Sequence, residues 1–184
     1  GFSQLIAALR QLATMSDLPP WNVLICGPTS VTEGGSGDDY FNTEIDRLNH
    51  ALPAERIQIQ PAEYDPEKLS AAFRAIDVFC LPSQAEQGET FGVAAVEAMA
   101  AGCSVVVSNL SCFADFIRPE ENALRYDHRG TDAVPRLTEQ LARLIRDPDL
   151  RQRLKGGGQS TSRNYDFGTY GKRLLADFEQ LVSP

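Results

Sequence analysis

Short runs of β-branched and aromatic residues alternate along the chain with longer segments in which apolar residues recur every three or four positions. The short runs predict strands and the longer segments predict helices. The predicted strands cover Val23–Cys26, Ile57–Gln60, Val78–Leu81, Ser104–Val107 and Ala123–Tyr126. The predicted helices cover Phe2–Leu12, Tyr40–Leu52, Pro66–Ile76, Phe91–Ala101 and Val134–Ile145, with a short helix over Asp149–Lys155 that Gly156–Gly158 would end.

This alternation predicts an α/β fold with a Rossmann-like, doubly wound parallel sheet and helices on both faces. Strands that are apolar throughout are typical of parallel strands buried on both sides, and parallel strands are joined by right-handed helical crossovers. We expect residues 1–184 to form a single domain of this kind. In such sheets ligands bind beyond the carboxyl ends of the strands, so the loops that follow the strands carry the functional information.

Length, net charge and cysteine spacing limit the number of domains and the kinds of molecule that the chain is expected to bind. With 184 residues, 42% of them hydrophobic, the chain can build one full core and no second domain of similar size. The net charge of −8, with no run of Lys and Arg, argues against nucleic acid as a partner. No apolar stretch reaches the roughly 20 residues of a transmembrane segment. The four cysteines fit no metal or disulfide spacing, and Cys26 and Cys80 fall inside predicted buried strands, so we expect a reduced, cytoplasmic, metal-free protein.

The loop after the first predicted strand is rich in glycine between Glu33 and Asp38. It is longer than a simple connection needs, which leaves two interpretations: a mobile surface segment or a flap over a ligand. No Lys-Ser or Lys-Thr follows the glycines, and no GxGxxG occurs, so neither a Walker phosphate loop nor a redox-cofactor fingerprint is present.

The most informative segment runs from Leu81 to Gly102, where a strand is followed by a polar loop and a small-residue helix. Thr90 is a suitable N-cap residue, so we expect the helix to open there. The amides of Phe91, Gly92 and Val93 would then be free, at the positive end of the helix dipole. Free amides in this place form an anion site, and Gly92 would let a diphosphate approach the backbone.

Two carboxylates bracket this helix start. Each could accept hydrogen bonds from vicinal hydroxyls, with a sugar at Glu89 and a ribose at Glu97. The alternative is that both are solvated helix charges. The neighbours of Glu97 between Ala94 and Ala101 are all small or apolar, and a carboxylate in such surroundings is expected to need a partner.

The Glu89-x7-Glu97 spacing within FGVAAVEAMAAGCSVVVS resembles the signature of retaining glycosyltransferases of the GT-B fold, of the family-4 or group 1 type. The resemblance extends from Phe2 to the terminal helices and implies a C-terminal, donor-binding half that lacks its first strand. By this resemblance Glu89 is the catalytic carboxylate at the donor sugar, and Glu97 holds the ribose. Residues 90–93, from Thr90 through Phe91 and Gly92 to Val93, hold the phosphates, and the loop Gln60-Pro61-Ala62 lies at the nucleotide base.

The chain also departs from the family pattern. Members place an Arg and a Lys just before the helix that here begins at Phe2, where they neutralise the leaving diphosphate. They also carry an N-terminal lobe that binds the acceptor. Many have Gly-Gly-x-x-Glu where this chain reads Ser111-Cys-Phe-Ala-Asp115. Asp115 is therefore expected at the carboxylate position, without the glycine pair.

The resemblance implies transfer of a hexosyl-type sugar from a nucleoside-diphosphate sugar to a glycan or lipid-linked acceptor, with retention and with no cofactor beyond the donor. The expected partners are the donor and the N-terminal lobe, through which a cytoplasmic enzyme could reach the inner face of a membrane. Two alternatives stay open: an isolated nucleotide-sugar-binding module without turnover, and a lobe of a GT-B epimerase or phosphorylase. His50 and His128 are assigned structural or solvent roles.

Overall fold

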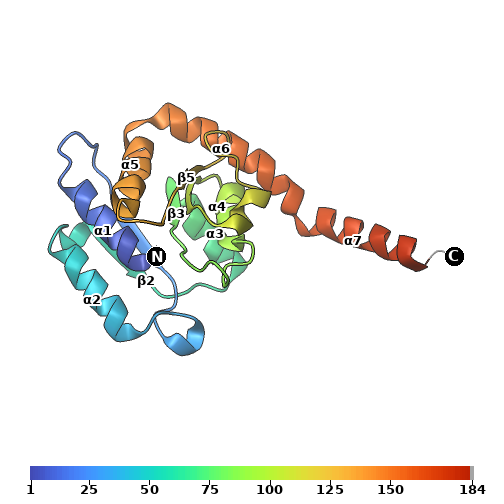
Figure 1. The fold of residues 1–184 in the computed structure, drawn as a ribbon, viewed down its shortest axis with the longest axis horizontal. Helices are drawn as coiled ribbons and strands as arrows, with labels where there is room; N and C mark the ends of the chain where they lie inside the picture. Colours follow the sequence, from blue (N-terminus) through green and yellow to red (C-terminus); the bar gives the residue numbers. More distant parts are fainter. Residues whose placement is uncertain (183–184) are drawn as a thin grey trace.

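The computed structural model describes residues 1–182. Helices and strands alternate as predicted, and the boundaries of the first three strands agree with the prediction (Figure 1). The strands are β1 (Val23–Cys26), β2 (Ile57–Gln60), β3 (Val78–Leu81), β4 (Ser104–Ser108) and β5 (Leu124–Tyr126). The α-helices are α1 (Phe2–Ala13), α2 (Asp38–Asn49), α3 (Pro66–Arg74), α4 (Val93–Ala101), α5 (Ala133–Arg146), α6 (Pro148–Ser162) and α7 (Phe167–Val182).

All strand pairs are parallel, but the strands form two separate sheets. One sheet has the order β1-β2, with Val23 opposite Ile57, and the other has the order β3-β4-β5, with Val78 opposite Ser104. Strands β1 and β3 are each paired on one side only, and both pack against the apolar cluster built on α1 and α5.

Helices cover both faces of the layer, and β4 shows this most directly. Every residue of β4 is buried. Val106 belongs to the apolar cluster of α1 and α5, whereas Val105 and Val107 belong to a second cluster with α4. Because side chains alternate along a strand, these two clusters lie on opposite faces of the sheet. The doubly wound arrangement expected from the sequence is therefore confirmed.

Two expectations from the sequence are wrong, one about burial and one about where a helix ends. Cys26 is exposed, because it ends β1 at the rim of the two-stranded sheet. The α6 helix does not stop before Gly156–Gly158 but continues through the glycines to Ser162. At Gly157 an added Cβ would lie 2.1 Å from the carbonyl oxygen of Glu121, so glycine here permits close packing and does not act as a cap.

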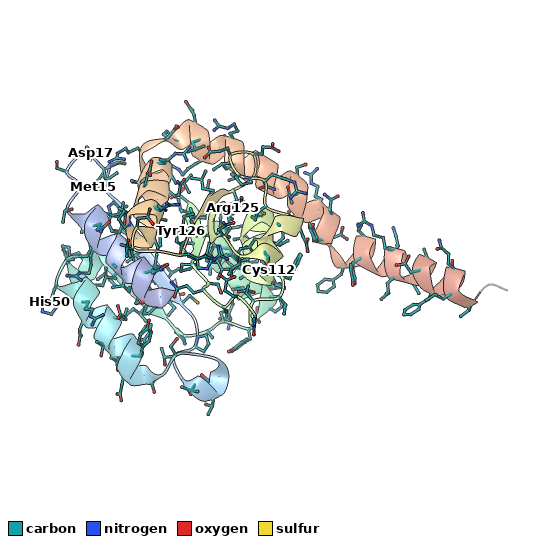
Figure 2. All side chains as sticks on the ribbon, viewed as in Figure 1. Met15, Asp17, His50, Cys112, Arg125 and Tyr126 are labelled. Atoms are coloured by element: carbon teal, nitrogen blue, oxygen red, sulfur yellow. The ribbon has the colours of Figure 1, made fainter. Side chains whose placement is uncertain are left out.

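The last helix, α7, projects away from the domain (Figure 1), and none of its side chains is buried. Figure 2 shows its side chains extending into open space, and it shows His50 at the outer end of α2, far from Cys112. Among residues 1–182, no helix combines the length and the apolar character that crossing a membrane requires.

Candidate functional site

The start of α4 is built on Gly92 and not on Thr90, which corrects the expected N-cap. Gly92 occupies the cap position with φ 81° and ψ 53°, a left-handed conformation that favours glycine. An added Cβ would also lie 2.4 Å from the ring of Phe113. The helix therefore opens two residues later than predicted, because the left-handed conformation of Gly92, against the Phe113 ring, precedes the first helical residue.

The backbone around Gly92 offers several free donors. The first intrahelical-type bond runs from the amide of Ala95 to the carbonyl of Gly92, at 2.9 Å. The amides of residues 91–94 make no hydrogen bond with any described residue. Phe91 itself is held by ring contacts to Phe116 and Tyr165, with centroids 5.0 and 5.3 Å apart. The result is a rigid start of a helix with unbonded N–H groups, which is the form of an anion site.

Glu89 lies close to the short helix that follows β4. It is half-buried, and none of the described residues donates a hydrogen bond to its carboxylate. Burial raises the pKa of the Cys112 thiol, the Glu89 carboxylate raises it further, and Asp115 contributes a weaker effect of the same sign. The structure thus brings Glu89 and Asp115 to the same thiol, although the sequence separates them by an entire helix and strand. Cys112 was not among the predicted site residues, and its only sequence signal is its place three residues before Asp115.

Glu97 contradicts one part of the prediction. It was expected to need a partner because its neighbours in sequence are apolar, but its side chain is exposed and has no partner among the described residues. The apolar neighbours Ala95, Val96, Ala98 and Met99 point into the core, whereas Glu97 shares the outer face of α4 with Val93, which is 59% exposed. Since 93 and 97 are one helical turn apart, they form one open face above the helix start.

A cavity of about 210 Å³ lies at the carboxyl ends of β1 and β2. Gln60 lines it, together with Phe2, Phe41 and Gly27. Pro61 and Ala62 follow Gln60, and the carbonyl of Pro61 accepts a hydrogen bond from the Cys26 thiol at 3.2 Å. The expected base-binding loop therefore borders an actual cavity.

The glycine-rich loop is folded over this same cavity. Gly34, Gly35 and Ser36 belong to its wall. The loop is closed by the amide of Gly37, which donates to the carbonyl of Thr29 at 2.8 Å, and by a hydrogen bond from the hydroxyl of Thr29 to Asp38. Of the two interpretations left open by the sequence, this geometry favours the flap.

Residues 1 and 2 link the cavity to the loop that follows β3. Phe2 lines the cavity, while Gly1 packs so closely on the carbonyl of Pro82, in the loop after β3, that a Cβ would not fit. All of these parts lie at the carboxyl edge of the strands, where doubly wound folds bind ligands. No group of His, Cys, Asp or Glu side chains within residues 1–182 is arranged to hold a metal ion.

Comparison with known proteins gives a family and a fold. The family described as glycosyl transferases group 1 matches residues 1–161. The phosphatidyl-myo-inositol mannosyltransferase of Mycobacterium leprae is 33% identical over 121 residues, which are 66% of this chain and 31% of that protein. The chain spans about a third of the length of the curated relatives it matches.

Solved structures agree. The C-terminal domain of a glycosyl transferase group 1 family protein, LpcC, from Francisella tularensis matches with a TM-score of 0.73 and 21% identity, over 90% of this chain and 79% of that one. Alr3699/HepE of Anabaena, solved in complex with UDP-glucose, matches with a TM-score of 0.75 and 19% identity, over 96% of this chain and 44% of that one. These likenesses establish the fold of a GT-B glycosyltransferase lobe.

Proposed function

The chain belongs to the glycosyl transferases group 1 family, and we propose that it is the donor-binding lobe of a retaining enzyme that uses a nucleoside-diphosphate sugar. The unbonded amides of residues 91–94, beside a Glu89 carboxylate without a partner, carry the proposal. Amides at a helix start bind phosphate oxygens, and a carboxylate accepts hydrogen bonds from sugar hydroxyls. The UDP-glucose in Alr3699/HepE supports a donor of this class.

The donor would lie along the carboxyl edge of the strands. In this pose the nucleotide base enters the cavity beside Gln60-Pro61-Ala62, under the glycine-rich flap. The ribose hydroxyls donate to Glu97 on the outer face of α4. The diphosphate lies on the backbone amides between Thr90 and Val93, and the sugar reaches Glu89, with Asp115 beside it.

The transfer itself would break the bond between the anomeric carbon and the diphosphate oxygen. Negative charge then develops on the leaving phosphate, where fixed amides and the positive end of α4 stabilise it without reorganisation. An acceptor hydroxyl attacks the anomeric carbon from the face that the diphosphate leaves, which retains the configuration, and the hydroxyl proton passes to the leaving diphosphate oxygen. The proposed reaction uses the donor and no further cofactor.

Calorimetric titration with UDP-, GDP- and ADP-glucose tests the donor site. We expect one of them to bind, and Glu97→Ala to weaken that binding by about 10- to 100-fold, because a carboxylate that accepts hydroxyl hydrogen bonds contributes about 1.5–3 kcal/mol. Glu139→Ala, at an exposed carboxylate on α5, is the matched control and is expected to leave the affinity unchanged. If the wild-type chain binds none of these donors, the proposed function is wrong; unchanged affinity in Glu97→Ala would remove only the ribose assignment.

We also propose that the 184-residue chain binds the donor without transferring its sugar, because the acceptor is expected to bind the other lobe of the parent enzyme. Incubation of the chain with a labelled donor and a panel of glycan and lipid-linked acceptors checks this. Transfer to an acceptor by the chain alone would contradict the binding-module reading. Conversion of the donor to an epimer, or its cleavage by phosphate, would instead favour the epimerase or phosphorylase alternatives.

A further inference from the structure

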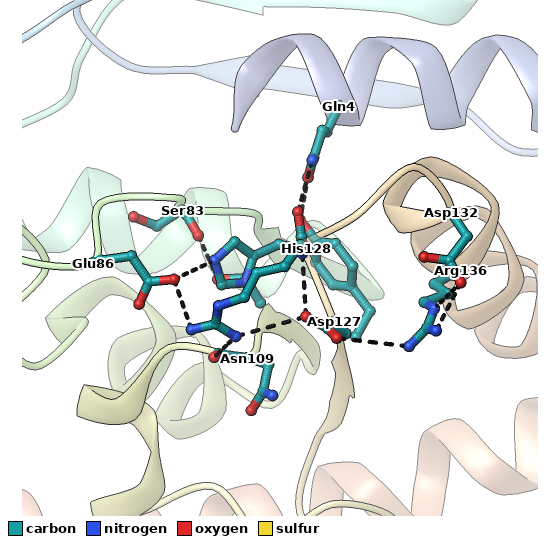
Figure 3. Close-up of polar contacts among 11 residues, drawn as sticks. Gln4, Ser83, Glu86, Asn109, Asp127, His128, Asp132 and Arg136 are labelled. Atoms are coloured by element: carbon teal, nitrogen blue, oxygen red, sulfur yellow. Dashed lines mark hydrogen bonds and ion pairs between the residues drawn. The ribbon is translucent and has the colours of Figure 1, made fainter.

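A polar cluster joins the three loops that follow β3, β4 and β5 (Figure 3). His128 and Arg129 come from the loop after β5, Glu86 from the loop after β3, and Asn109 from the loop after β4. Gln4 of α1 completes the cluster, because its amide donates to the carbonyl of His128 at 3.0 Å. The cluster therefore ties α1 and three post-strand loops together at the edge where the donor is expected.

His128 is the buried member of this cluster. Its side chain is only 4% exposed, and its Nε2 lies 3.0 Å from Oε1 of Glu86. The guanidinium of Arg129 contacts the same Oε1 at 2.6 Å and donates to the carbonyl of Asn109 at 3.0 Å. The carboxylate of Glu86 is thus held between a buried imidazole and a half-exposed guanidinium.

This contact is the side-chain tether of an otherwise exposed loop. Among the described hydrogen bonds and ion pairs, those of Glu86 are the only side-chain interactions that join residues 84–90 to other elements. The loop turns tightly after Glu86, because the amide of Glu89 donates to the carbonyl of Ala85 at 3.0 Å. Whatever holds Glu86 in place therefore also holds the backbone that carries Glu89.

The burial of His128 has a cost that packing alone does not explain. Its Nδ1 is buried and has no hydrogen-bond partner among residues 1–182. A buried polar atom without a partner opposes folding, and an apolar side chain at this position would avoid that penalty. Local departures of this kind are expected where a residue serves a site.

We propose that His128 is a positioning residue for the donor site: through Nε2–H it fixes Glu86, and through Glu86 it fixes the loop that presents Glu89. The inference rests on the proposed donor role of Glu89. It goes beyond that role, because it assigns the fixed position of residues 84–90 to a histidine in the loop after β5. It also specifies that Nε2, the ring nitrogen that faces the carboxylate, carries a proton.

The test uses two substitutions that differ in where they place an amide nitrogen. In His128→Gln the nitrogen superposes on Nε2 and can still donate to Glu86, whereas in His128→Asn it superposes on Nδ1 and cannot. We expect His128→Asn to speed hydrogen exchange of amides 84–90 and to weaken donor binding, each by about tenfold, the effect of losing one charge-assisted hydrogen bond. His128→Gln is expected to restore both towards the wild-type values. Side-chain ¹⁵N shifts of His128 report directly whether Nε2 carries a proton.

Glu86→Ala is included in case the His128 variants do not fold. It removes the same contact by changing the exposed partner, Glu86, and leaves the buried His128 in place. It should reproduce the faster exchange, and adding His128→Asn to it should have no further effect on the loop. The proposal is overturned if amides 84–90 exchange as slowly in Glu86→Ala as in the wild type. It is also overturned if His128→Gln and His128→Asn show the same exchange rates and the same donor affinity. Hydrogen exchange is measured without ligand. If the wild-type chain binds no donor, the proposed function is refuted, but the exchange rates of residues 84–90 still test the role of His128.

Discussion

At the scale of single residues, Cys112 offers a direct test of how Glu89 is placed. Burial raises the pKa of the Cys112 thiol, and the charge of Glu89 raises it further. Because only the thiolate reacts with alkylating reagents, we expect Glu89→Gln to lower this pKa and to speed alkylation of Cys112 roughly twofold near neutral pH. The rate is measured with iodoacetamide and peptide mass spectrometry, in a chain that also carries Cys26→Ser.

The matched control for this experiment is Glu121→Gln. Glu121 is an exposed carboxylate that makes no contribution to the pKa of Cys112. We expect the alkylation rate of Cys112 to be unchanged in that variant. Equal rates in Glu89→Gln and wild type would show that the two side chains are farther apart than the structure places them. A bound donor should slow alkylation in the wild-type chain, since the proposed sugar position lies beside the thiol.

At the scale of elements, two neighbouring glycines of α6 should respond to the same substitution with opposite signs. A Cβ at Gly156 meets nothing within 4 Å, whereas at Gly157 it would lie 2.1 Å from a backbone oxygen. We expect Gly156→Ala to raise the free energy of unfolding by about 0.5–1 kcal/mol, the helix-propensity gain of alanine. Gly157→Ala should lower it by about 1–3 kcal/mol, because the backbone must shift to admit the methyl group.

Urea unfolding of the two variants and the wild type measures both changes. The experiment also distinguishes a helix that ends at these glycines from one that continues through them. If the glycines ended the helix, as the sequence suggested, alanine at either position would be unfavourable. A stabilising Gly156→Ala together with a destabilising Gly157→Ala requires the continuous helix packed on Glu121.

At the scale of the whole molecule, α7 should be dispensable for the stability of the domain. Its apolar side chains are highly exposed, including Phe167 at 98% and Leu181 at 79%. Because folding stability comes from buried apolar area, removal of residues 167–184 is expected to change the free energy of unfolding by less than about 0.5 kcal/mol. Binding of the dye ANS, which reports exposed apolar surface, should fall.

A deeper truncation provides the contrast. Ending the chain at Asp147 removes α6, whose Leu150 and Leu154 are buried in the core cluster of α1 and α5. Loss of two buried leucines costs several kcal/mol, so this shorter chain should unfold or become molten. Chemical denaturation and near-UV circular dichroism follow both truncations. A large loss of stability on removing α7 alone would mean that the helix packs on the domain in solution.

The amino-acid pattern was enough to predict the parallel α/β layer and the boundaries of β1, β2 and β3, because strands and helices impose different spacings on their apolar residues. It also located the loop and helix of the candidate site, since the carboxyl end of a parallel strand is where ligands bind. Through the resemblance it supplied the roles of Glu89 and Glu97, which stay predictions.

Contacts between residues remote in sequence decided the rest. Gly92 became the cap of α4 because Phe113 closes over it, α6 ran through its glycines because Glu121 lies against Gly157, and Glu97 faced outward because its apolar neighbours filled the core. His128 gave no local signal, since its burial and its bond to Glu86 join segments 42 residues apart. Local pattern records which residues prefer to be buried, and only the tertiary packing decides what each of them meets there.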